Sequence, residues 1–169
     1  DTLIGGNGID TLTYATSSAG VAVTLSSSTT AGGASQQAAT FNGLPNGDAA
    51  LDVVSNTIEN LTGSAFSDQI YGNQFDNTIR TGAGNDTVRG GNGADRLVVD
   101  GAGTNNLYGD GLLGDPLTDG LDTYVILSSA TGTTIIRDYQ FNTDAALAED
   151  IYVADQIAPL SLVSLAGVG

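Results

Sequence analysis

A nine-residue period rich in glycine and aspartate is the feature that most constrains how this chain folds. Residues 5–13, GGNGIDTLT, match the pattern G-G-x-G-x-D-x-U-x, in which U is a large apolar residue. From residue 63 onward the period resumes as a polar and an apolar ladder. The polar ladder is Asp68, Asn77, Asp86 and Asp95, and the apolar ladder is Ile70, Ile79, Val88 and Leu97. Two coincident ladders indicate a repeat architecture.

The copies differ in quality. Residues 81–89 and 90–98 are the best copies, and residues 1–4 are the tail of an earlier one. After a one-residue slip at Val99, residues 100–108 form a weaker copy with Asn105 in the aspartate position. A last copy begins at Gly109 and closes around Asp122. Because Asp1 falls inside a motif, we expect the chain to be a fragment or a processed product.

The spacing predicts an all-β fold, a right-handed parallel β-roll. The Gly-rich part of each copy makes a turn with positive φ, and the three residues x-U-x make a short strand with one inward side chain. Two copies then complete one coil, and stacked coils pair in parallel. The glycines expected to shape these turns, and to offer carbonyl oxygens, are Gly6, Gly8, Gly82, Gly84, Gly91, Gly93, Gly103 and Gly120.

The aspartates of the turns are candidate ligands for several Ca²⁺ ions. Calcium takes six to eight oxygen ligands, and a cation between stacked turns would supply stability that such short strands lack. Folding and calcium binding should therefore be one event. The candidate side-chain ligands are Asp10, Asp68, Asn77, Asp86, Asp95, Asn105 and Asp122. Because alternate copies share an edge, we pair Asp68 with Asp86, Asn77 with Asp95, Asp86 with Asn105, and Asp95 with Asp122.

A simpler interpretation is that these aspartates only cap turns, as Asp often does. Phe66 and Phe75 occupy the place of the fourth-position glycine, where a bulky residue disfavours positive φ. We expect these two turns to pack an aromatic ring and to bind calcium weakly or not at all.

Composition narrows the possible functions. The chain has 19 acidic residues against four basic ones, a net charge of −15, and neither His nor Cys. Such a surface repels nucleic acid and attracts cations, and zinc sites of the usual kind, Cys nucleophiles and Ser-His-Asp triads are excluded. No apolar run is long enough to insert into a membrane. We therefore expect a chain that is not an enzyme. The only support for a carboxylate-pair glycosidase would be the abundance of Asp. The only support for an ice-binding face would be scattered Thr and Asn residues.

Four segments are expected along the chain. Residues 1–13 start the roll, residues 14–61 form an inserted lobe, residues 62–125 form the main roll, and residues 126–169 contribute capping strands over its open end. Within the lobe, residues 20–25 alternate as a strand, whereas the Ser/Thr-rich residues 26–40 are expected to be loop.

The nonapeptides resemble the RTX (repeats-in-toxin, or haemolysin-type) calcium-binding family. The segment IENLTGSA at residues 58–65 and the segment DTYV at residues 122–125 support the resemblance. It implies an extracellular or cell-surface protein of a Gram-negative bacterium, exported unfolded by type I secretion and folded outside by calcium. The apolar terminus at residues 160–169 does not match a secretion signal that we can identify.

The roll of this family serves several classes of protein, so two functions stay open. The first is a structural or adhesive module of a surface or matrix protein, such as an adhesin, S-layer or filament component, with calcium and neighbouring copies of itself as partners. Residues 166–169 followed by residues 1–4 would make a copy short by one residue, which suggests tandem units. The alternative is an accessory C-terminal module of a secreted protease, lipase or alginate epimerase, with catalysis encoded upstream.

Overall fold

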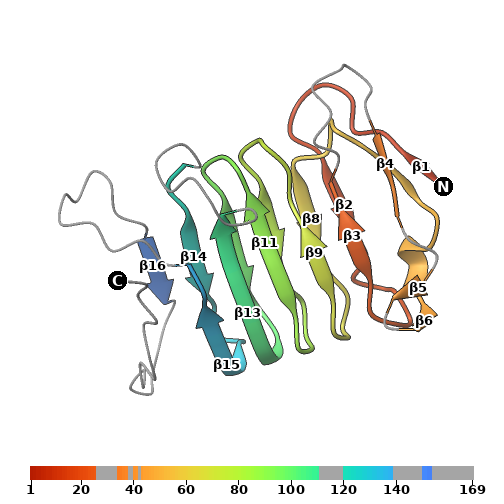
Figure 1. The fold of residues 1–169 in the computed structure, drawn as a ribbon. Coiled ribbons are helices and arrows are strands. Elements are labelled where there is room, and N and C mark those ends of the chain that lie inside the picture. The colour runs from red at the N-terminus through yellow and green to blue at the C-terminus, as the bar shows by residue number, and fades with distance from the viewer. Residues whose placement is uncertain (26–33, 38–39, 42, 111–119, 139–149, 154–169) are drawn as a thin grey trace.

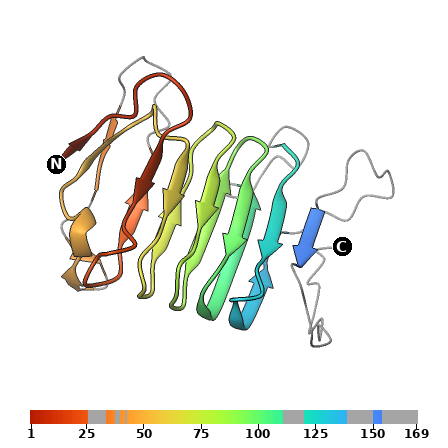
Figure 2. The ribbon, with the colours of Figure 1, turned by 180° about the vertical axis from the view of Figure 1, so that it is seen from behind.

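The chain forms an all-β parallel roll. Successive coils of the chain follow one another along one axis, and their strands form two facing sheets (Figure 1). The computed structural model describes residues 1–25, 34–37, 40–41, 43–110, 120–138 and 150–153. The view from behind shows the same succession of coils, with the N-terminal lobe at one end and β16 at the other (Figure 2).

Strands alternate between the two sheets along the sequence, as a nine-residue repeat requires. The six-stranded sheet has the order β16-β14-β12-β10-β8-β2 and the five-stranded sheet the order β15-β13-β11-β9-β3. The six strands are β2 (Thr11–Thr13), β8 (Asn60–Thr62), β10 (Thr78–Arg80), β12 (Arg96–Val99), β14 (Thr123–Ile126) and β16 (Asp150–Val153). The five are β3 (Ala22–Thr24), β9 (Gln69–Tyr71), β11 (Thr87–Gly91), β13 (Ala102–Asp110) and β15 (Thr131–Ile136).

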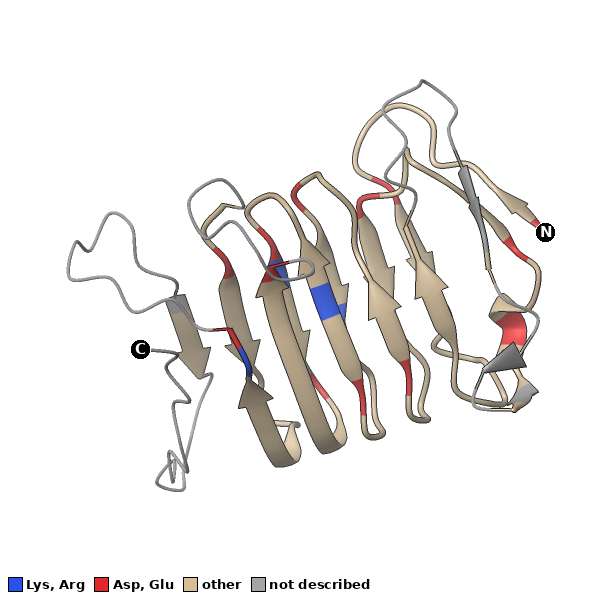
Figure 3. Cartoon of the chain, viewed as in Figure 1, with Lys and Arg blue, Asp and Glu red and all other residues tan. Residues whose placement is uncertain are grey.

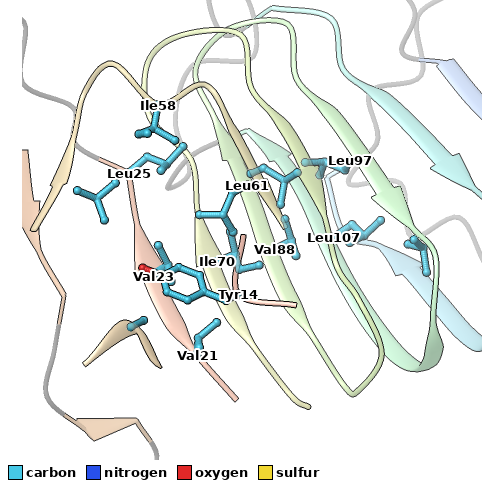
Figure 4. Packing of buried hydrophobic residues seen from close by; sticks show 14 of the residues in the cluster. Tyr14, Val21, Val23, Leu25, Ile58, Leu61, Ile70, Val88, Leu97 and Leu107 are labelled. Carbon is cyan, nitrogen blue, oxygen red and sulfur yellow. The ribbon is translucent and has the colours of Figure 1, made fainter. Parts of the chain in front are cut away.

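All pairs within the two roll sheets are parallel, and their register aligns the apolar position of each repeat. Leu12, Leu61, Ile79, Leu97, Tyr124 and Ile151 follow one another across the six-stranded sheet. Val23, Ile70, Val88, Leu107 and Ile136 do the same in the five-stranded sheet. The predicted inward ladder is confirmed, because Ile70, Ile79, Val88 and Leu97 are fully buried. Figure 4 shows Ile70, Val88 and Leu97 among the buried side chains between the sheets, and this hydrophobic core holds the coils together.

The roll sheets extend beyond residues 62–125. Within residues 14–61, β3 pairs with β9 and β8 pairs with both β2 and β10. After residue 126, β15 pairs with β13 and β16 with β14, both in parallel. The expected capping strands are therefore further rungs of the roll; residues 139–149 and 154–169 lie outside the described residues.

Together with residues 2–3, the rest of the inserted lobe forms a small outer layer at the N-terminal end. In it, β1 (Thr2–Leu3), β7 (Val53–Ser55) and β4 (Ala34–Gln36) make a three-stranded sheet. A two-stranded sheet, β5 (Thr40–Phe41) and β6 (Leu44–Pro45), precedes the 3₁₀ helix η1 (Gly47–Ala49). The Ser/Thr-rich segment expected to be loop thus contains β4, which pairs antiparallel with β7; residues 26–33 and 38–39 lie outside the described residues.

Charge is distributed by position in the repeat. Figure 3 shows acidic residues at the turns and strand ends and arginines along the strands. On the outer face of the five-stranded sheet, Tyr71, Arg89 and Tyr108 are neighbours in register. The guanidinium of Arg89 lies 3.7 Å from the centre of the Tyr108 ring. The acidic groups therefore concentrate where the coils turn.

Candidate calcium sites

The predicted polar residues lie at equivalent places along the two edges of the roll. Asp68 and Asp86 immediately precede β9 and β11, and Asn105 occupies the corresponding place in β13. On the opposite edge, Asn77, Asp95 and Asp122 immediately precede β10, β12 and β14. All six side chains are buried. The nine-residue period has therefore brought alternate members of the ladder to one edge.

Hydrogen bonds join each side chain to the coil before it. On the first edge, Oδ1 of Asp68 accepts from the N–H of Val21 at 2.8 Å, and Oδ1 of Asp86 accepts from the N–H of Asp68 at 2.9 Å. Oδ1 of Asn105 accepts from the N–H of Asp86 at 3.2 Å. On the second edge, the N–H of Asn77 donates to Asp95 Oδ1 at 2.7 Å and the N–H of Asp95 donates to Asp122 Oδ1 at 2.8 Å. The four pairs expected from the spacing thus lie in adjacent coils and are joined directly.

Three aspartates have a second oxygen that no described group satisfies. Oδ2 of Asp10, Asp86 and Asp95 is buried and lacks a hydrogen-bond partner among the described residues. Asp86 is 0% exposed and Asp95 is 1% exposed. Burying an unpaired carboxylate oxygen is costly, and such groups in proteins are usually paired or bound to a metal. These oxygens therefore fit a hard cation such as calcium, which takes carboxylate ligands.

The same burial changes the acidity of the two aspartates in the ladder. Burial raises the pKa of Asp86 from 3.8 to about 7, and the nearby charges of Asp68 and Asp100 act in the same direction. Burial raises the pKa of Asp95 from 3.8 to about 9, with Asp122, Asp76 and Asp110 adding to the rise. Without a bound cation, burial therefore shifts both carboxyl groups toward the neutral form, Asp95 further than Asp86.

Glycine allows a carboxylate and a backbone carbonyl to converge at the first position of a copy. A Cβ on Gly90 would collide with Oδ2 of Asp95 and with the carbonyl oxygen of Gly109 in the next coil. A Cβ on Gly63 would likewise collide with the carbonyl oxygen of Thr81 and Oδ2 of Asp68. Calcium combines oxygens of these two kinds, so the donor chemistry of the turns fits the ion.

The expected positive φ angles are confirmed at all eight predicted glycines. They are Gly6, Gly8, Gly82, Gly84, Gly91, Gly93, Gly103 and Gly120. At Gly84 and Gly93 close approach adds a second constraint, because a Cβ there would collide with the backbones of Phe66 and Phe75 in the preceding coil. The packing of aromatic rings expected at these turns is wrong: Phe66 is 47% exposed and Phe75 is 44% exposed.

Glu59 is a member of the ladder that the sequence analysis missed. Its Oε2 accepts a hydrogen bond from the N–H of Asp10 at 2.9 Å, just as the other ladder residues accept from the preceding coil. Glu59 lies nine residues before Asp68, so extending the ladder back by one period would have found it.

Asp138 is a second missed residue, and no repeat spacing signals it. Its Oδ1 accepts from the N–H of Gly109 at 3.0 Å and from the hydroxyl of Tyr124 at 3.1 Å. Its Oδ2 accepts from the N–H of Asp110 at 3.2 Å. Burial raises its pKa, and the hydrogen bonds only partly offset the rise. Asp138 thus satisfies backbone donors of the turn that begins at Gly109.

The carboxylates are spread along the edges of the roll. Within the described ranges, no three acidic side chains gather closely enough to form a metal site by themselves. A calcium ion at these turns would thus combine at most two of the described carboxylates with other oxygen ligands, such as backbone carbonyls. The assignment of individual residues as ligands stays a prediction.

These features define a parallel β-roll with calcium-type turns, and comparison with known families agrees. Residues 1–13 and 59–97 match four copies of the RTX calcium-binding nonapeptide repeat. These parts of the chain therefore carry RTX-type nonapeptide repeats, a repeat that binds calcium. A comparison with curated proteins gave no match.

The family also bears on where such a protein works. RTX repeat proteins are typically secreted by Gram-negative bacteria. In the described parts of this chain, no helix has the length and apolarity needed to cross a membrane.

Proposed function

We propose that this chain is a calcium-stiffened structural or adhesive module of a secreted bacterial surface or matrix protein, and that it has no catalytic activity. The observation that carries the proposal is Oδ2 of Asp86 and of Asp95, each buried at the turn of a glycine-rich coil and without a hydrogen-bond partner in the described part of the chain. A repeated ladder of cation ligands would make the roll stiff along its axis, because each ion would connect one coil to the next.

Calcium stabilises the roll by neutralising charge that the fold itself brings together. Alternate aspartates lie in adjacent coils on one edge, and the chain has a net charge of −15. Without a cation, folding must either protonate these groups or bury their charge, and both outcomes are unfavourable near neutral pH. Bound calcium supplies positive charge and is coordinated by the Oδ2 atoms of Asp86 and Asp95. The free energy of calcium binding therefore adds to the free energy of folding.

A non-catalytic role is supported by the way the acidic groups are used. The sequence has no His and no Cys, and the ladder carboxylates are held one by one by the backbone of the neighbouring coil. They therefore act as repeated structural groups along the roll.

The test is a calcium titration of the chain followed by far-UV circular dichroism. We expect a reversible and cooperative gain of β signal with a midpoint of about 10⁻⁴–10⁻³ M, the range of extracellular calcium modules. Magnesium at the same concentration should not reproduce it, since Mg²⁺ demands stricter octahedral geometry and dehydrates reluctantly. A spectrum that is fully folded in chelator and unchanged by calcium would overturn the proposal.

Sedimentation velocity with and without calcium then tests self-association. Growth in size that depends on calcium supports the structural role with neighbouring copies as partners. The accessory role predicts instead that a catalytic domain is encoded immediately before Asp1 and that the chain stays monomeric with calcium.

A further inference from the structure

Two of the turns are closed by side chains of the repeat itself. In the turn before β9, Ser64 takes the place of the second glycine. Its hydroxyl donates to Asp68 Oδ1 at 2.7 Å and accepts from the N–H of Phe66 at 3.0 Å, and its N–H donates to Asp68 Oδ2 at 2.6 Å. Both oxygens of Asp68 are therefore hydrogen-bonded without a cation.

The turn before β10 is closed in the same way by an amide. Asn73 also stands in the place of the second glycine, and its Oδ1 accepts from the N–H of Phe75 at 2.9 Å. Oδ1 of Asn77 accepts from the N–H of Asn73 at 2.9 Å, while its Nδ2 donates to the carbonyl of Glu59 at 3.0 Å. Asn77 carries no charge, and both ends of its amide are satisfied.

The N-terminal edge of the five-stranded sheet is likewise satisfied by side chains. Oε1 of Gln37 accepts from the N–H of Thr24 at 2.6 Å, and its Nε2 donates to the carbonyl of Thr24 at 2.9 Å. The Asn46 amide makes the same two bonds to the backbone of Ala22. Two buried amides thus stand in for a further strand beside β3, an edge that would otherwise expose unpaired backbone groups.

The later coils differ from this region. The turns leading to Asp86 and Asp95 have glycine at the second position, Gly82 and Gly91, and so have no side chain at the place that Ser64 and Asn73 occupy in the earlier turns. The Oδ2 atoms of both aspartates remain without a partner among the described residues. The hydrophobic core is also well developed in the earlier region. Eight members of the buried cluster precede residue 62: Tyr14, Val21, Val23, Leu25, Ala49, Val54, Ile58 and Leu61.

We propose that the roll has two parts with different requirements for calcium. The described portion of residues 14–77 folds without the ion, because Ser64, Asn73, Gln37 and Asn46 supply the hydrogen bonds that calcium or another strand would supply. Near neutral pH, the coils from Thr81 onward stack on β9 and β10 and fold only when calcium binds. The inference rests on the proposed function, since it takes Asp86 and Asp95 to be calcium ligands.

Hydrogen–deuterium exchange of the full chain, read by mass spectrometry in chelator and in calcium, tests the division. In chelator, peptides covering β3, β7, β8 and β9 should exchange more slowly than peptides covering β11, β12 and β13, by on the order of tenfold or more. Calcium should protect the later peptides and leave the earlier ones almost unchanged. If all peptides gain protection together, the division is wrong while calcium-coupled folding stands. If none responds, both the division and the proposed function fail.

The variant Ser64→Ala/Asn73→Ala tests whether the side-chain caps carry this behaviour. It should abolish the protection of β8 and β9 in chelator and keep most of it in calcium. Ser128→Ala/Asn92→Ala is a matched control, because both side chains are exposed and neither makes a described hydrogen bond through its polar group. Equal protection in the two variants would overturn the role of the caps.

A gain-of-function variant gives an independent readout. Ser64→Gly/Phe66→Gly converts residues 63–68 into a complete glycine turn that ends in Asp68. Isothermal titration calorimetry should then count one more calcium ion than for the unmodified chain. An unchanged count would show that Ser64 does not replace a calcium ion in this turn.

Discussion

The backbone N–H of Asn77 donates to Oδ1 of Asp95 at 2.7 Å, while Oδ2 of the same carboxylate has no described partner. One oxygen thus connects two coils by a hydrogen bond, and the other is the oxygen that we propose binds calcium. The two interpretations of the repeat aspartate, turn cap and calcium ligand, are therefore assigned to different atoms of one side chain. A substitution that keeps Oδ1 and replaces Oδ2 can separate them.

Asp95→Asn should change stability in opposite directions with and without calcium. In chelator the variant should be more stable than the unmodified chain, because it retains an acceptor for Asn77 and removes a buried carboxylate. In calcium it should need roughly tenfold more ion to fold, since affinity depends on the charge of the ligands. Circular dichroism in both conditions measures the two effects.

Asp48→Asn is the control for this prediction. Asp48 is exposed in η1, and the substitution removes the same charge without touching the ladder. If Asp95→Asn and Asp48→Asn gave equal calcium midpoints, Asp95 would be a turn cap only.

Acidification should fold the calcium-free chain. The pKa of Asp86 is raised from 3.8 to about 7 and that of Asp95 to about 9, so the neutral forms favour the fold. Because the folded pKa values lie above the unfolded ones, this contribution is complete below about pH 4 and is lost as the pH rises through about 7 and then about 9. In chelator, the β signal should therefore increase as the pH is lowered from 9 to 5.

The pH response should be smaller in Asp86→Asn/Asp95→Asn, because an amide does not titrate in this range. General relief of the negative net charge affects both chains alike. A response of the same size in the variant and the unmodified chain would assign the effect to net charge and contradict the prediction.

The repeat part of the fold could be predicted from the sequence because each copy encodes its own turn and strand. Ile79 and Leu97 lie 18 residues apart and pair directly, as two nonapeptides per coil require. The pairing of Asp68 with Asp86 followed from the same arithmetic. Turn geometry and the nine-residue period were sufficient there, because the period alone determines which strands pair.

The pairing across the insertion could not be predicted in this way. Val23 aligns with Ile70 and Leu12 with Leu61, and no period connects the members of either pair. The strand at Ala22–Thr24 was expected from alternation, but its partner is selected by core packing, and its other edge is covered by the amides of Gln37 and Asn46. Side-chain amides that replace a strand leave no signal in hydrophobic patterning.

Asp138 should stabilise the roll whether or not the calcium sites are altered. Asp138→Ala removes the acceptor for two backbone N–H groups and the Tyr124 hydroxyl, and leaving buried donors unpaired costs about 1–3 kcal/mol. Urea unfolding at saturating calcium should show a loss of that order. Tyr124→Phe keeps the ring and removes the hydroxyl, which donates to Asp138 and is one of two acceptors for the N–H of Gly109, so it should cost less. A loss from Asp138→Ala no larger than that from Tyr124→Phe would contradict the assignment.

The last prediction concerns the outer face of the five-stranded sheet, where Arg89 stacks on Tyr108 in the adjacent strand. A cation over an aromatic ring at such a partly exposed site contributes about 0.5–1 kcal/mol. Arg89→Met should therefore lower the free energy of unfolding at saturating calcium by about that amount, with no coupling to calcium stoichiometry. Removing any arginine also makes a chain of charge −15 more negative, so the control must lose the same charge. Arg96→Met does so from an exposed site in β12 with no described ion pair. A double-mutant cycle of Arg89→Met with Tyr108→Leu isolates the pair, and a coupling energy near zero would mean that the arginine acts only through the net charge.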